Sequence, residues 1–146
     1  MKQVGQVLSL YIASTSQHKN VNKIQLTPLG IINDKHYNKN NNRSILITSI
    51  ESYEKVKNHN IDIENGALGE NILVSFNPYQ LPVGTQLKIN HTILEITENC
   101  TLCNHLSKID KQLPKLIKKD RGIFAKIIFG GEIEVNHSIY LVKTNE

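Results

Sequence analysis

The sequence predicts a mainly β protein: a single closed or nearly closed mixed β-barrel with a few short helices. Short apolar runs rich in Ile, Leu and Val recur along the 146 residues, and Asn, Gly and Pro separate them. Aromatic residues make up only 5% of the chain and Trp is absent, so the core must be aliphatic. A chain of this length suits one core, and no repeat or linker interrupts it. We therefore expect one domain over residues 1–146.

The first half of the chain is expected to place strands around one capped helix. β-branched apolar runs indicate strands at residues 4–13, 23–26, 44–48 and 72–74. Between these strands, residues 14–22 and the Asn-rich stretch 38–42 have the composition of loops. Ser49 is the clearest helix N-cap, and residues 52–58 follow it as a short surface helix.

The second half is expected to contain two hairpins and a helical insertion. Strands are indicated at residues 86–89, 93–96, 123–129, 132–135 and 139–142. Asn90-His91 is expected to form the turn that joins the first two of these strands. Gly130-Gly131 is expected to form the turn that joins the next two. Helical spacing over residues 105–119, interrupted by one proline, indicates one or two short helices.

The charge and hydropathy of the chain exclude several classes of protein. The net charge of +4 is mild and modestly favours anionic ligands. Nucleic-acid binding is not indicated, because no strand offers an aromatic stacking platform and no helix-turn-helix or zinc-finger spacing occurs. The chain has no apolar run of membrane-spanning length and no export signal at its N-terminus. We therefore expect a cytoplasmic protein without a membrane partner.

Only two of the seventeen basic residues are arginines, Arg43 and Arg121. In a chain so biased towards Lys and Asn, a retained arginine hints that its flat two-pronged donor is needed, as it is for a carboxylate or a phosphate. The alternative is that both are ordinary surface arginines.

The two cysteines, Cys100 and Cys103, form a Cys-x-x-Cys segment at the end of a predicted strand. A thiolate is a strong nucleophile and a preferred ligand for soft metals. A zinc site would take His105 as a third ligand and would need a fourth from elsewhere. A thiol–disulfide exchange site is disfavoured, because hairpins rather than a βαβ unit surround the pair. The pair could also be two small, semi-buried apolar residues.

A glycine segment precedes the strand at 72–74. Gly66 and Gly69 allow positive φ or a close approach of the backbone, and Glu70-Asn71 then supplies an acceptor and an amide at the mouth of a strand. Either Glu70 contacts a ligand, or it ties down the loop by accepting backbone N–H bonds.

Asp34 and His36 share one turn upstream. An Asp-x-His pair can orient an imidazole for proton transfer, or it can be an exposed turn. The other four histidines fall in predicted turns or at element ends and are expected to be solvated: His18, His59, His91 and His137.

Taken in order, these segments resemble the MOSC domain, the C-terminal module of molybdenum cofactor sulfurases that also occurs as small bacterial proteins. The segments that carry the resemblance are Gly30-Ile31-Ile32-Asn33-Asp34-Lys35-His36, Arg43-Ser44, Gly66-Ala67-Leu68-Gly69-Glu70-Asn71, Val83-Gly84, Thr97 with Cys103, and Arg121-Gly122-Ile123-Phe124-Ala125 with Gly130-Gly131. The sequence departs from the family pattern where Thr85 replaces an acid and where Asn136-His137 replaces a Gly-Asp turn.

The resemblance implies a β-barrel and a site for the molybdenum cofactor, a molybdopterin. It implies that Cys103 is the catalytic residue and the ligand of the metal. The cofactor-binding residues that it implies are Asp34, Lys35, His36, Arg43, Gly69, Glu70, Asn71 and Arg121. Such a protein would handle sulfur or reduce N-hydroxylated small molecules, and would need an electron-donor protein or a cysteine desulfurase in trans.

Two other functions remain as alternatives to this one. The chain could be a non-catalytic carrier or interaction module of cofactor biosynthesis, or it could be a small zinc-binding protein. The role of Cys100 is open, since a disulfide with Cys103 would switch the site off.

Overall fold

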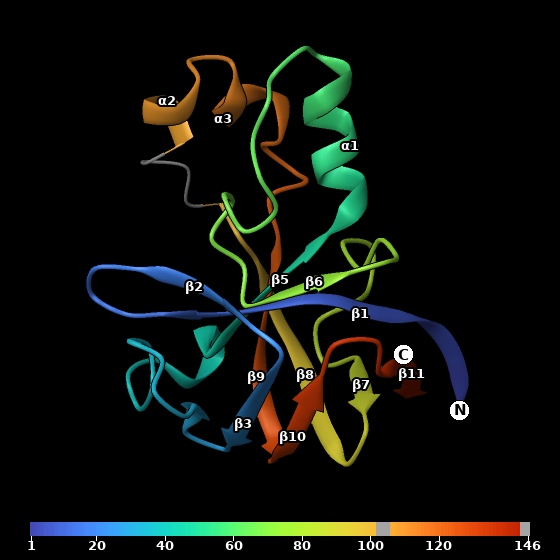
Figure 1. The fold of residues 1–146 in the computed structure, drawn as a ribbon. Coiled ribbons are helices and arrows are strands. Elements are labelled where there is room, and N and C mark those ends of the chain that lie inside the picture. The colour runs from blue at the N-terminus through green and yellow to red at the C-terminus, as the bar shows by residue number, and fades with distance from the viewer. Residues whose placement is uncertain (102–105, 144–146) are drawn as a thin grey trace.

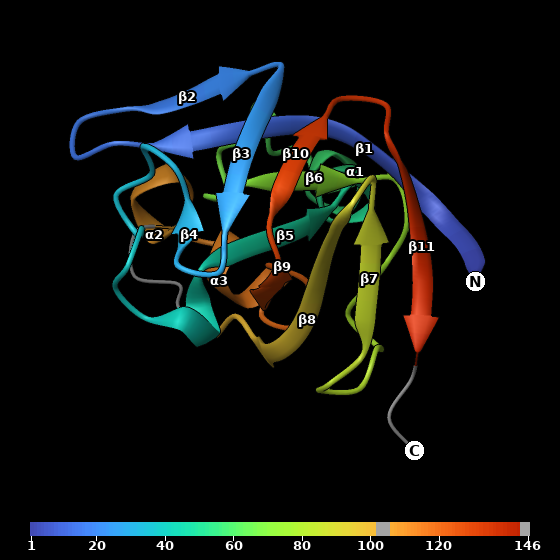
Figure 2. The same cartoon turned by 90° about the horizontal axis from the view of Figure 1, so that it is seen from below.

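The computed structural model describes residues 1–101 and 106–143, and their strands close into a barrel (Figures 1 and 2). Its strands are β1 (Lys2–Ala13), β6 (Ile72–Val74), β5 (Ile45–Ser49), β9 (Ile123–Phe129), β8 (Thr92–Asn99), β7 (Gln86–Ile89) and β11 (Ser138–Lys143), in this spatial order. Pairing of β11 with β1 closes the barrel, which confirms the predicted fold class. None of the helices among the described residues is long and apolar enough to cross a bilayer.

The barrel is mixed because β5 and β6 run parallel, with Ile47 opposite Ile72. Parallel neighbours need a crossover connection, and α1 (Ile50–Asn58) provides it. The predicted N-cap is present, since the Ser49 hydroxyl accepts a hydrogen bond from the Glu51 N–H. The helix therefore begins where the sequence predicted.

Two further short helices, α2 (Leu106–Ile109) and α3 (Leu113–Leu116), lie beside α1 on one side of the barrel (Figure 1). A 3₁₀ turn, η1 (Asn41–Arg43), precedes β5. The predicted hairpin between β7 and β8 is confirmed, with Asn90 in the left-handed region at the turn.

The predicted hairpin over residues 123–135 is wrong. β9 pairs with β5 and β8, whereas β10 (Gly131–Glu134) pairs with β3 (Lys23–Thr27) in a second, three-stranded sheet. β3 also pairs with β4 (Gly30–Ile31) in that sheet. The chain changes sheets at Gly130, where a Cβ would lie 2.3 Å from the Leu26 carbonyl oxygen. The two glycines therefore mark a crossing between sheets and not a tight turn.

The predicted loop at residues 14–22 contains a strand, β2 (His18–Val21), which extends the sheet beyond β1. Most of β2 is exposed and it has no apolar alternation. Its pairing with β1 holds it in place, and the Asn20 side-chain amide adds a hydrogen bond to the Leu10 carbonyl. A strand that buries so little apolar surface leaves no hydrophobic pattern in the sequence.

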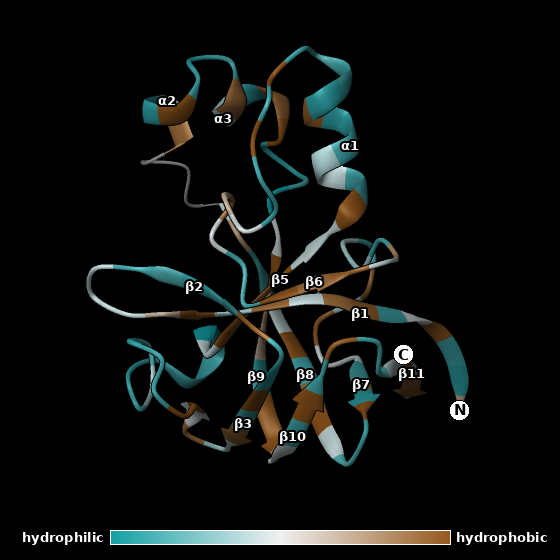
Figure 3. Ribbon diagram, viewed as in Figure 1, coloured by the Kyte–Doolittle hydropathy of each residue, from teal (hydrophilic) through white to brown (hydrophobic). Residues whose placement is uncertain are grey.

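Two mainly aliphatic cores stabilise the fold. Figure 3 shows that hydrophobic residues recur along the barrel strands. The barrel interior contains alternate residues of the strands, including Ile45, Ile47, Ile123 and Ala125. The second core lies between the helices and the barrel wall, with Leu73 of β6 facing it. Its members are Tyr53, Val56, Ile61, Leu68, Leu73, Leu106, Leu113 and Ile117.

Left-handed backbone conformations in the described residues occur at glycines and at asparagines alone. The non-glycine residues with positive φ are Asn33, Asn38, Asn60, Asn90 and Asn136. Asparagine tolerates this region better than other L-residues because its short side chain can bond the local backbone.

Candidate functional site

A cavity of about 740 Å³ lies against the outer wall of the barrel, where several predicted polar segments meet. Its floor is the outward face of β5 and β9: Leu46 and Phe124 line the cavity, whereas their strand neighbours point into the barrel core. The rest of the lining comes from the end of β1, the start of β2, residues of the segments 35–43 and 66–71, Cys100 after β8, and Arg121 before β9. We refer to this space as the site cavity.

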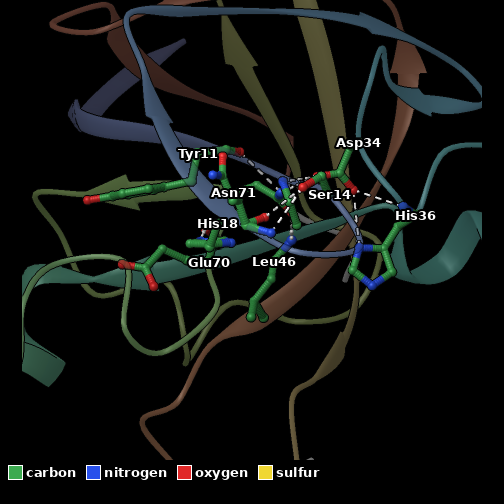
Figure 4. Close-up of polar contacts among 10 residues, drawn as sticks. Tyr11, Ser14, His18, Asp34, His36, Leu46, Glu70 and Asn71 are labelled. Carbon is green, nitrogen blue, oxygen red and sulfur yellow. Dashed lines mark hydrogen bonds and ion pairs between the residues drawn. The ribbon is translucent and has the colours of Figure 1, made fainter.

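The Asp34 side chain lies behind the cavity lining and connects the end of β1 to the 34–36 turn through hydrogen bonds (Figure 4). The side chain is buried, and its two oxygens accept hydrogen bonds from the backbone N–H of Ala13 at 2.7 Å, the backbone N–H of His36 at 3.0 Å and the side-chain amide of Asn71 at 3.2 Å. Its Oδ2 also lies 3.1 Å from His36 Nδ1. Burial alone would raise the pKa of Asp34, but these hydrogen bonds outweigh it and lower the pKa below its ordinary value.

The Asp34 carboxylate fixes the orientation of the His36 ring. A carboxylate only accepts, so His36 Nδ1 donates to it, and a neutral imidazole then presents the lone pair of Nε2. His36 lines the site cavity while Asp34 lies behind it. The Asp-x-His pair thus gives an oriented imidazole at the cavity rim, with the His36 side chain 52% exposed.

Asn71 joins three parts of the chain at the cavity wall (Figure 4). Its Oδ1 accepts from the Leu46 N–H at 3.1 Å, and its amide group donates to the Tyr11 carbonyl at 3.3 Å and to Asp34. The backbone N–H of Asn71 also donates to the Leu46 carbonyl. This residue therefore ties β1, β5 and the Asp34 turn together, and it lines the cavity as well.

Glu70 lies beneath the glycine loop and does not line the site cavity. Its side chain is fully buried, and its carboxylate accepts from Tyr53 Oη at 2.7 and 2.8 Å and from the Gly66 N–H at 3.1 Å. Tyr53 Oη in turn accepts from the N–H groups of Gly66 and Leu68. Burial raises the pKa of Glu70 above its ordinary value despite these hydrogen bonds. Of the two predicted roles, the geometry matches the one in which Glu70 ties down the loop.

We expect Tyr53→Phe to destabilise the protein by about 2 kcal/mol, because two buried backbone donors and the Glu70 carboxyl would lose their shared partner. Urea unfolding measures this change. Tyr140→Phe is a matched control, since Tyr140 is half-buried at the barrel surface, and it should change stability by less than about 0.5 kcal/mol. Equal losses in the two variants would contradict the role assigned to the Tyr53 hydroxyl.

Four cationic side chains line the site cavity: Lys35, Lys39, Arg43 and Arg121. The Arg43 guanidinium forms an ion pair with Glu98 at 2.7 Å and lies 5.3 Å from the Phe124 ring centroid. Arg121 is buried, and its Nη2 donates to the Leu68 carbonyl at 3.2 Å. Both arginines are therefore fixed by defined contacts at the cavity, and the expectation of two ordinary surface arginines does not hold for Arg121.

An apolar wall completes the site cavity, formed by Leu46, Cys100 and Phe124. Cys100 directly follows β8 and is only 3% exposed. Its backbone N–H donates to the Gly122 carbonyl, which aligns the end of β8 with the start of β9. A thiol, an aromatic ring and an aliphatic chain thus line the same cavity as the four cations.

Sequence reasoning did not single out His18 as a site residue; it is exposed, as expected, but it also lines the site cavity. Its Nε2 lies 2.7 Å from the Glu70 carbonyl, and its ring stacks on Tyr11 with centroids 5.1 Å apart. A carbonyl only accepts, so Nε2 donates and Nδ1 has the lone pair. Burial lowers the pKa of His18, which favours this neutral form. The sequence carries no signal for it, because β2 has no hydrophobic pattern and its register with the end of β1 is seen only in the structure.

The structure brings most of the predicted cofactor-binding residues to one place. Those that line the site cavity are Lys35, His36, Arg43, Gly69, Asn71 and Arg121. The cavity is also lined by four residues that sequence reasoning did not single out as site residues: Lys39, Asn40, Leu46 and Phe124. Asp34 and Glu70 support the walls from behind. Cys103, the predicted catalytic residue and metal ligand, lies outside the described residues, as does His105.

The zinc hypothesis depends on these two undescribed residues together with Cys100. Within residues 1–101 and 106–143, no three side chains of His, Cys, Asp or Glu gather as a metal site would require. The hypothesis stays a prediction, and metal analysis of the purified protein would test it.

The fold and the cavity define a β-barrel protein with a site of cofactor size on its outer wall. The family model of the MOSC domain matches residues 34–140, so the chain belongs to the MOSC domain family. The match extends from the Asp34 turn into β11 and includes the described floor of the cavity.

Several solved structures share this fold. The YuaD protein from Bacillus subtilis is 20% identical, with a TM-score of 0.79 over 95% of this chain and 96% of that chain. YiiM from Escherichia coli is 14% identical, with a TM-score of 0.75 over 97% of this chain and 71% of that chain. YiiM from Geobacillus stearothermophilus is 14% identical, with a TM-score of 0.71 over 97% of this chain and 75% of that chain. No curated protein matches the chain.

Proposed function

We propose that this MOSC protein binds the molybdenum cofactor in the site cavity and is the catalytic component of a reductase for N-hydroxylated compounds, with Cys103 as the thiolate ligand of the metal. The observation that carries the proposal is the composition of the cavity: its lining combines four cations with an apolar wall that contains Cys100, three residues before Cys103. The alternative function at the same site is sulfur transfer, with Cys103 carrying the transferred sulfur.

The residues present fit this cofactor. The molybdenum cofactor has an anionic phosphate, a polar pterin ring and a soft metal held by sulfur. Arg43 and Arg121 bring to the cavity the guanidinium groups that suit a phosphate or pterin oxygens, and binding there would compete with the pairing of Arg43 to Glu98. Lys35 and Lys39 add positive charge to the lining. The volume of about 740 Å³ lies within the range usual for sites of cofactor size.

The chain's own residues then have distinct tasks in the proposed reaction. Bound cofactor would supply a redox-active metal beside the thiolate. Reduction of an N–OH group breaks the N–O bond, consumes two electrons and two protons, and releases water. His18 and His36 are placed to exchange these protons, because each ring has one nitrogen held by a protein acceptor and the other with a lone pair. In this proposal an electron-donor protein, of the iron–sulfur or flavin type, supplies the electrons.

The decisive experiment is expression in a host that makes the cofactor, followed by elemental analysis and pterin fluorescence of the purified protein. We expect Cys103→Ala to lower the molybdenum content by at least about tenfold, because it removes the metal's thiolate ligand. Cys100→Ala is the matched control: it removes a buried thiol from the cavity wall and should leave the molybdenum content nearly unchanged. Equal retention by both variants would reject Cys103 as the ligand.

The same preparation separates the reductase from a non-catalytic carrier. With methyl viologen as the electron source, wild-type protein loaded with cofactor should convert a hydroxylamine or an N-hydroxylated base to the amine. Retained cofactor without turnover would support the carrier, and transfer of sulfur from a desulfurase to Cys103 would support the sulfur-handling role.

A further inference from the structure

A second cavity, of about 700 Å³, lies on the other side of Cys100. Among the described residues, Cys100 lines both cavities. The residues around this second space include four lysines, Lys55, Lys115, Lys118 and Lys119, and we refer to it as the lysine cavity. Two cavities of similar size therefore share one buried lining residue.

The lysine cavity belongs to a basic surface on the helical side of the barrel, where α1, α2 and α3 lie together (Figure 1). Residues 106–120 contain five lysines, all exposed, and two aspartates. Asp120 is paired with Lys55 at 2.7 Å, and Asp110 accepts from the Gln112 N–H. With five lysines against two aspartates, residues 106–120 carry a net charge of +3.

Apolar surface accompanies the positive charge. Ile109 at the end of α2 is 42% exposed, and Leu116 lines the lysine cavity beside Lys115. A mixed surface with exposed apolar side chains among charges suits a protein partner better than a small anion. An acidic partner would be guided to this surface by its charge.

We infer that the lysine cavity and the lysines of residues 106–120 are the docking surface for the acidic face of an electron-donor protein. The inference rests on the proposed function, since it names where the electrons arrive. A donor seated there would be separated from the site cavity by the Cys100 wall. Cys100 is only 3% exposed, so its thiol is not accessible to a sulfur donor seated in the lysine cavity. Electron transfer does not require an open path between the two cavities; it requires only that the donor lies close to the site cavity.

The test uses a reduced acidic ferredoxin and a reduced acidic flavodoxin as probes, each titrated against the cofactor-loaded protein at low and at physiological salt. The variant is Lys118→Glu/Lys119→Glu. The control is Lys2→Glu/Lys88→Glu, which makes the same charge change on β1 and β7, away from the helices. We expect the Kd for the better probe to rise at least about tenfold in the first variant and less than about twofold in the control at low salt.

Two further readouts separate this inference from the proposed function. Turnover with methyl viologen, a small reductant that needs no docking surface, should be equal in all three proteins. If methyl viologen supports no turnover, the proposed function fails. If it does, the docking inference is overturned when neither probe binds the wild-type protein with salt-sensitive affinity, or when both variants weaken binding equally.

Discussion

Asp34→Ala is expected to destabilise the protein by about 3 kcal/mol at pH 7, since the buried carboxylate accepts from two backbone N–H groups and one side-chain amide. The substitution leaves the Ala13 N–H and the Asn71 amide without this acceptor in a buried region. It also frees the His36 ring at the rim of the site cavity. We therefore expect lower cofactor retention together with lower stability.

The pH dependence gives this prediction a second readout. The pKa of Asp34 is lower in the folded than in the unfolded state, so its ionised form contributes stability above the ordinary value near pH 4 and loses it as pH falls further. The stability gap between wild type and Asp34→Ala should be constant above about pH 5 and should narrow below about pH 4.

Urea unfolding across this pH range measures the gap. Asp62→Ala, at an exposed position, is the control and should cost less than about 0.5 kcal/mol at each pH. A gap that stays the same from pH 7 to pH 3 would show that Asp34 is not held ionised by its hydrogen bonds.

Gly130→Ala is the second substitution with a large expected effect, about 3 kcal/mol or more of lost stability. A Cβ there would lie 2.3 Å from the Leu26 carbonyl oxygen and 3.0 Å from the Thr27 Cα. Both are backbone atoms in β3, so no side-chain rotation relieves the clash. The two sheets would have to separate where the chain passes from β9 to β10.

Thermal or urea unfolding measures this loss against Gly5→Ala as the matched control. At Gly5 the nearest atoms belong to the Phe76 ring and the Ser75 side chain, which can move aside. We expect the control to lose about 1 kcal/mol. A Gly130→Ala variant no less stable than Gly5→Ala would contradict the close contact between the sheets.

Much of the barrel could be predicted from the sequence because its strands are aliphatic and end at turn residues. The helix after Ser49 and the Asn90-His91 turn were also recognisable, since capping and hairpin turns depend on neighbouring residues. β2 was not, because backbone pairing with β1 holds it with little apolar burial. The predicted strand partner of β10 was wrong because β10 pairs with β3, whose residues lie about a hundred positions earlier in the chain.

The candidate site shows the same division. Its polar segments were recognisable, but the direction of each side chain was not: Glu70 faces Tyr53 under the loop, and Asp34 faces Asn71 behind the rim. His18 was missed because its contact with the Glu70 backbone joins residues that are 52 positions apart. The apolar wall of Leu46 and Phe124 was hidden, because outward-facing and core residues of a strand look alike when both are hydrophobic.

The five asparagines in left-handed backbone positions have a consequence for how relatives of this protein are compared. Glycine adopts the same conformation without cost, so a homologue could exchange residues at these turns and keep an identical chain path. Such exchanges at the five turn positions would lower the sequence identity between two relatives although their backbones remained the same. Kinship within this family is therefore better judged from the cavity wall and the strand interiors than from the turns.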